Sequence, residues 1–178
     1  MSLTQNAAAA SRLCTACGMC CDGTMFQVVH LQPGDQPAEL GKLGLKIRSR
    51  AMGFFMEQPC PALRDTRCTV YDQRPTRCRL FHCQQLRLLE AGQSSEADVM
   101  SMIDSARALV AQVSELILQN GLREDGQALI DRFERVVSTP VDADLEPDLA
   151  KAREQLKDVM SRLRLLLNRH FRPPPPVK

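Results

Sequence analysis

All eight cysteines of this 178-residue chain lie in its first half, between Cys14 and Cys83. The first four are crowded into the octapeptide CTACGMCC, which ends in two adjacent cysteines. Cysteines that are buried one at a time in a core would not gather in this way. Clustered thiols form disulfides in oxidising compartments and bind metals in reducing ones, so the compartment decides how the cluster is interpreted.

The first residues of the chain favour a reducing compartment. The start, MSLTQNAAAASRL, has no basic residue before Arg12, and its longest apolar run is four alanines. Neither the charged start nor the hydrophobic middle of a signal peptide is therefore present. No run of eighteen apolar residues indicates a transmembrane helix. We expect a soluble cytoplasmic protein without a membrane partner, in which the cysteines are metal ligands.

The spacing of the cysteines supports metal binding. A two-residue gap lets the chain make a tight turn that aims two sulfurs at one ion, and Gly18 relieves the backbone there. The triplet Cys14, Cys17 and Cys20 has the spacing of bacterial ferredoxins, whose cluster is completed by a distant Cys-Pro such as Cys60-Pro61. The later cysteines predict ligands from a loop, a short hairpin around CTVYD and a helix starting near Cys78. The predicted metal ligands are Cys14, Cys17, Cys20, Cys21, Cys60, Cys68, Cys78 and Cys83.

The doubled cysteine indicates that the ligands are divided. Adjacent side chains diverge and rarely bind one tetrahedral ion together, so Cys20 and Cys21 are expected to face different partners. Eight thiols fit two sites of four or one larger cluster, and the sequence leaves their pairing open. Zinc and iron-sulfur clusters both accept four thiolates. The ferredoxin-like triplet and the later Cys-Pro favour an iron-sulfur cluster slightly over zinc.

The segment around the later cysteines is basic, although the whole chain has a formal net charge of only +2. Guanidinium groups there would offset the negative charge of a thiolate site and lower thiol pKa values. Few aromatic side chains accompany them, so nucleic acid is not an expected partner. The arginines are Arg64, Arg67, Arg74, Arg77, Arg79 and Arg87, against Asp65 and Asp72.

The second half of the chain predicts three helices from the spacing of its apolar residues. The first starts near Glu96 after a cap at Ser94 or Ser95 and stops at Gly121. The second covers about 123–137, and the third starts around Pro147 and ends before RPPPPVK. The expected fold is mainly α, a cysteine-rich, loop-dominated metal-binding unit packed against a helical hairpin or bundle. The predicted parts are the cysteine cluster at 12–90, the helical region at 95–171 and a disordered proline-rich tail at 172–178.

The cysteine-containing motifs resemble those of a known family. CTACGMCC, followed by CPAL, RCTVYDQRPTRCR and LFHC, resembles the CxxCxxCC family of zinc- or iron-chelating proteins, the YkgJ-like cysteine cluster proteins. The resemblance covers about residues 12–90 and implies a zinc or iron-sulfur site. A similar cluster occurs in flagellin lysine methylases, but the second half of this chain has nothing that looks like their additional domain. The matching positions are the eight cysteines with Tyr71, Arg74, Pro75, Arg79 and Phe81.

Three classes of function are compatible with these features. A redox or cluster-carrying protein needs iron in a protected site, whereas a zinc-structured interaction module needs closed tetrahedral sites and a helical region that binds a protein partner. An enzyme needs an open coordination position and a base. Enzyme ranks lowest, because the all-cysteine set has no carboxylate or histidine at ligand spacing, and His82 is expected to pack or to support a ligand. No catalytic residue and no binding site for an organic cofactor is predicted.

Overall fold

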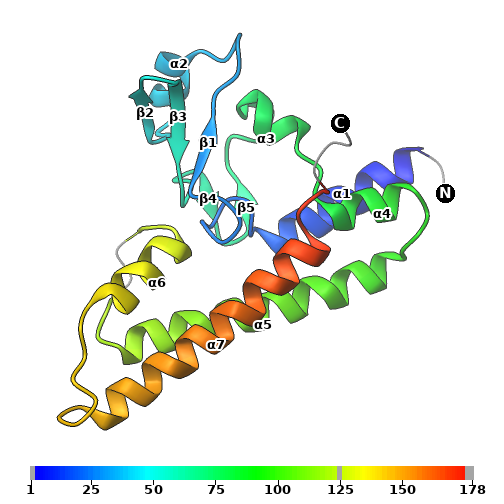
Figure 1. Cartoon of the computed structure of the whole chain (residues 1–178). Coiled ribbons are helices and arrows are strands. Elements are labelled where there is room, and N and C mark those ends of the chain that lie inside the picture. The colour runs from blue at the N-terminus through cyan, green and yellow to red at the C-terminus, as the bar shows by residue number, and fades with distance from the viewer. Residues whose placement is uncertain (1–2, 124–125, 175–178) are drawn as a thin grey trace. The chain divides into compact units, whose positions relative to one another are not determined.

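The computed structural model describes residues 3–123 and 126–174 of the chain (Figure 1). The chain divides into two compact units, residues 1–82 and residues 83–178. Helices predominate, as the sequence predicts, but the first unit also contains two small sheets. Only residues 172–174 of the predicted tail are among the described residues. The packing of a cysteine unit against the later helices stays a prediction.

The first unit opens with helix α1 (Leu3–Cys17), where the sequence analysis expected a tight turn. Cys14 and Cys17 lie on its last turn, and the chain leaves the helix at Gly18, whose φ is +67°. The Gly18 N–H donates to the Cys14 carbonyl at 3.1 Å, and Gly18 O accepts from Cys21 N–H at 2.8 Å. The turn therefore begins only after the first Cys-x-x-Cys, because the preceding run of alanines favours a helix.

A three-stranded antiparallel sheet, which the sequence analysis did not predict, follows α1. Its strand order is β1-β3-β2, and the short helix α2 lies between β1 and β2 in the chain. One face of the sheet contributes Met56 to a small core with Leu40, Leu45 and Ala62. This core gives the cysteine-rich segment an apolar support. The bounds are β1 (Val28–His30), α2 (Pro37–Lys42), β2 (Ile47–Arg50) and β3 (Gly53–Glu57).

The later cysteines are carried by a hairpin and a short helix. Strands β4 (Leu63–Arg64) and β5 (Arg67–Cys68) form the hairpin, and Leu63 pairs with Cys68. The hairpin therefore ends at Cys68, and the expected hairpin around CTVYD is wrong, because a turn at Asp65 and the 3-10 helix η1 (Tyr71–Gln73) occupy the neighbouring segments. The predicted helix near Cys78 is confirmed as α3 (Thr76–Leu80).

The second unit is helical and confirms most of the predicted helix boundaries. Ser95 caps α5 in a reciprocal pair with Asp98, and Pro147 begins α7, both as the sequence predicts. The second predicted helix begins at Leu129, later than expected, and residues 124–125 of the expected segment lie outside the described residues. The helices are α4 (Gln84–Glu90), α5 (Glu96–Gln119), α6 (Leu129–Ser138) and α7 (Pro147–His170).

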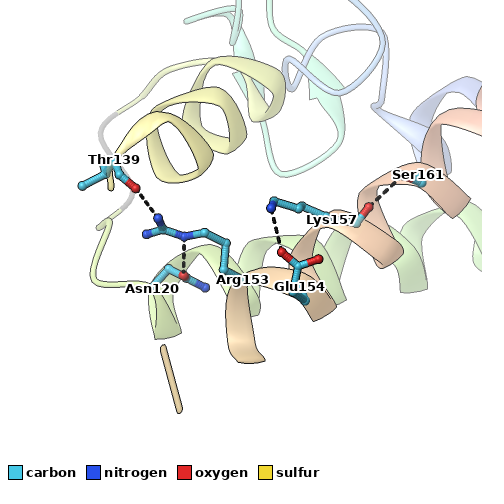
Figure 2. Close-up of polar contacts among 6 residues, drawn as sticks. All are labelled: Asn120, Thr139, Arg153, Glu154, Lys157 and Ser161. Carbon is cyan, nitrogen blue, oxygen red and sulfur yellow. Dashed lines mark hydrogen bonds and ion pairs between the residues drawn. The ribbon is translucent and has the colours of Figure 1, made fainter. Parts of the chain in front are cut away.

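Helices α5 and α7 lie side by side over most of their length (Figure 1). Their buried apolar residues recur at helical spacing and face one another. At one end of the pair, the buried guanidinium of Arg153 on α7 donates to Asn120 Oδ1 at 3.5 Å and to the Thr139 carbonyl (Figure 2). Arg153 thus ties the segments before and after α6 to α7.

Candidate metal centre

Backbone hydrogen bonds bring three distant cysteines together in the first unit. The Cys60 N–H donates to the Cys21 carbonyl at 2.7 Å, which joins the loop after α1 to the segment before β4. The Leu63 N–H donates to the Cys60 carbonyl at 3.0 Å, and Leu63 pairs with Cys68 across the hairpin. Cys21, Cys60 and Cys68 therefore lie on adjoining pieces of backbone.

Cys78 joins these three through the apolar core. Its side chain and that of Cys60 are both partly buried and pack against the cluster formed by Leu40, Leu45, Met56 and Ala62. Cys78 lies in the middle of α3, so the placement of that helix decides where its sulfur lies. We call Cys21, Cys60, Cys68 and Cys78 the four-thiol cluster.

The electrostatics of the thiols reflect this grouping. Burial, and after it the charges of Cys60, Cys78 and Cys68 in that order of size, together raise the pKa of Cys21 to about 12. Burial also raises the pKa of Cys78 to about 11, with Cys60 contributing in the same direction. Thiolates disfavour one another only over short distances, so these pKa shifts place the four sulfurs in one neighbourhood.

Several groups oppose the accumulation of negative charge in the four-thiol cluster. Burial raises the pKa of the Cys60 thiol, and hydrogen bonding to the amide groups of Ala62 and Leu63 lowers that pKa in part. The charge of Arg74 lowers the pKa of Cys78. Arg74 is held in place by stacking on the Tyr71 ring, 3.7 Å from its centroid, and by donating to the Tyr71 carbonyl at 2.9 Å. One of the predicted arginines thus acts electrostatically on a cluster thiol.

The other four predicted ligands are carried by the end of α1, the turn after it and the start of α4. Cys14 is exposed and Cys17 half-buried, and their i, i+3 spacing puts them on one face of α1. Cys20 is half-buried in the turn that follows. Cys83 belongs to the second unit, at the N-cap position of α4, where burial raises its pKa and the nearby amide groups of α4 partly offset that rise. All eight cysteines are free thiols.

The four-thiol cluster has the donor set of a metal centre, but not yet its bonding geometry. Within residues 3–123 and 126–174, no group of three or more histidine, cysteine, aspartate or glutamate side chains is arranged to hold a metal ion. Four thiolates are the ligands of structural zinc sites and of iron-sulfur clusters. The residues therefore fit either group in their chemistry, and binding would require the sulfurs to draw together.

Comparison with known proteins identifies this part of the chain. Residues 13–100 match the model of the CxxCxxCC family, described as "Putative zinc- or iron-chelating domain". This segment is a domain of the CxxCxxCC family. The matched segment holds all eight cysteines, so the resemblance seen in the sequence is confirmed. No curated protein and no solved structure matches the chain.

The CxxCxxCC domain also contains a polar residue that the sequence analysis missed. Asp35, between β1 and α2, accepts hydrogen bonds from Thr76 at the start of α3. The only local signal was the turn-forming sequence PGDQP, which says nothing about a contact with Thr76.

His82, which was expected to pack or to support a ligand, is exposed at the end of the first unit. No helix among the described residues is long and apolar enough to span a membrane.

Proposed function

We propose that this protein binds an iron-sulfur cluster or zinc through its clustered cysteines and serves as a small redox or metal-carrying protein. The convergence of Cys21, Cys60, Cys68 and Cys78 within a CxxCxxCC domain is the observation that supports this most strongly. Chelation of zinc or iron is the description of the family. The choice of metal and the redox role are our inference.

The four-thiol cluster would supply one complete ligand set. Cys60 keeps amide donors on its sulfur, and Arg74 places a positive charge near Cys78, two features that favour bound thiolates. An iron-sulfur cluster, when bound, would supply one-electron chemistry, and zinc would supply structure alone. The ferredoxin-like spacing of the first three cysteines favours the iron-sulfur cluster.

The remaining cysteines would then form a second ligand set or enlarge the first. Cys14 and Cys17 share a face of α1, and Cys20 follows in the next turn, directly before Cys21 of the four-thiol cluster. Different partners for Cys20 and Cys21 are part of this proposal, because adjacent side chains diverge. Cys83 is at the N-cap position of α4, in the second unit, and its role as a ligand stays a prediction.

Anaerobic purification followed by metal analysis and visible absorbance tests the proposal. We expect at least about one equivalent of metal, with visible absorbance if iron-sulfur is present and none if the metal is zinc. Cys21→Ser and Cys20→Ser should each lower metal content but leave different spectra or metal counts, because they remove ligands of different sets. A fresh, folded protein with no metal and eight titratable thiols would refute metal binding.

The main alternative is a zinc-structured module that binds a protein through its helical region. It shares the four-thiol cluster and differs in having no redox chemistry. Colourless protein that carries zinc after anaerobic preparation, and that does not take up iron and sulfide during reconstitution, would favour this alternative over the redox role.

A further inference from the structure

Asp35 connects two distant parts of the first unit through both of its carboxylate oxygens. Oδ1 accepts from the Thr76 N–H at 2.9 Å and from the Thr76 hydroxyl at 2.7 Å. Oδ2 accepts from the Gln32 N–H at 2.8 Å. The carboxylate therefore links the loop between β1 and α2 to the first residue of α3, across 41 positions of sequence.

Helix α3 depends on such outside contacts. It has five residues, and its own cap position is Pro75, which makes no side-chain capping bond. Helices this short are not stable by themselves, and a carboxylate that accepts an amide of the first turn supplies the missing cap. At the other end of α3, the Phe81 ring packs edge-on against Phe26, with the centroids 5.1 Å apart.

Cys78 lies between these two anchors, and Phe26 follows Cys21 closely in the chain. The anchor at Phe26 thus joins the end of α3 to the loop of Cys21, and the anchor at Asp35 sets where α3 begins. Without the anchor at Asp35, α3 could turn or unwind while the Cys60 N–H still donated to the Cys21 carbonyl at 2.7 Å.

We propose that Asp35 is a positioning residue of the metal centre, whose bonds to Thr76 hold Cys78 within reach of the other three cluster thiols. This inference rests on the proposed metal binding. It differs from a general stabilising role, because it assigns the effect of Asp35 to one ligand. Removal of the carboxylate should therefore change the ligand set itself as well as the stability of the fold.

Cobalt(II) titration of the reduced, metal-free full chain tests this proposal, since cobalt-thiolate charge-transfer absorbance reports the number of bound thiolates. Asp35→Ala should weaken cobalt binding by about 10–100-fold, the usual effect of losing a residue that orients a ligand. Its absorbance per bound ion should fall to that of Cys78→Ser. Asp72→Ala, which removes an exposed carboxylate from η1, is the matched control and should resemble the wild type.

The double variant Asp35→Ala/Cys78→Ser separates positioning from general stability. If Asp35 acts through Cys78, the double variant should bind cobalt no more weakly than Cys78→Ser alone. Should Asp35→Ala fold poorly by circular dichroism, Thr76→Val provides a milder change, because it removes the hydroxyl bond and keeps the amide bond. It should then lower the absorbance per ion partially.

Two results would overturn the inference alone. One is an unchanged absorbance per bound ion in both Asp35→Ala and Thr76→Val. The other is that Asp35→Ala lowers the affinity for cobalt as much in the Cys78→Ser chain as in the wild-type chain. Such a result would mean that Asp35 has a purely structural role. A wild-type protein that gives no cobalt-thiolate absorbance would instead refute the proposed function, and the inference with it.

Discussion

The raised pKa of Cys21 makes a quantitative prediction about the reactivity of the metal-free protein. Its pKa is about 12, against an ordinary value of 9.0, chiefly because the thiol is buried and secondarily because three other thiols surround it. Only the thiolate attacks a disulfide, so below pH 9 the reactive fraction of Cys21 should be about 1,000-fold smaller than that of an ordinary cysteine. A thiolate of higher pKa is more nucleophilic, which recovers about 30-fold over this range.

The net expectation is that Cys21 exchanges about 30-fold more slowly than an ordinary cysteine, before restricted access slows it further. The assay is reaction of reduced, chelator-treated protein with a small aliphatic disulfide, followed by acid quenching and site-resolved mass spectrometry. The same chain unfolded in urea provides the reference for Cys21. The exchange rate of Cys14, which is exposed, provides a comparison within the folded chain for a thiol that the disulfide reagent can reach.

The order of the causes can be checked in the same assay. Because burial is the largest cause, Cys60→Ala should accelerate exchange at Cys21 only slightly, although it removes the charge with the largest effect on that pKa. Exchange at Cys21 in the folded, metal-free protein at the rate of the unfolded chain would refute the buried four-thiol cluster. A large acceleration by Cys60→Ala would show that repulsion between thiols, and not burial, sets the pKa.

Two further predictions concern stability. Since the pKa of Cys21 is higher in the folded state, its contribution to the free energy of unfolding is complete below pH 9 and is lost as the pH rises toward 12. Urea unfolding of metal-free protein should show this alkaline decline, and Cys21→Ala should flatten it; parallel curves for both proteins would contradict the shift. In the second unit, Arg153→Met should lower the free energy of unfolding by about 2–3 kcal/mol, because two bonds from a buried guanidinium are lost. Lys157→Met, which breaks the exposed 2.7 Å pair with Glu154, should cost less than about 1 kcal/mol in the same urea titration, and equal costs would refute this role of Arg153.

The helices of the second unit could be predicted because their determinants are local. The cap at Ser95, the proline at Pro147 and the apolar residues repeated at helical spacing each act within a few positions of the chain. The same holds for the family, since the spacing of CTACGMCC and the later motifs is itself the signature. The start of α6 at Leu129 was misplaced, because the residues before it have a composition that suits a helix or a loop.

The first unit shows where local patterns stop being informative. The alanine run extends α1 to Cys17, where the Cys-x-x-Cys spacing was interpreted as a tight turn, and the strands of the small sheet are too short to show a clear alternation. The sequence by itself determined that thiols gather in this unit and that a metal suits them. The tertiary structure alone decided that Cys21 meets Cys60, Cys68 and Cys78, and that Asp35 holds the helix of Cys78. These contacts join residues far apart in the chain, and a polar side chain carries no local mark of the distant amide that will satisfy it.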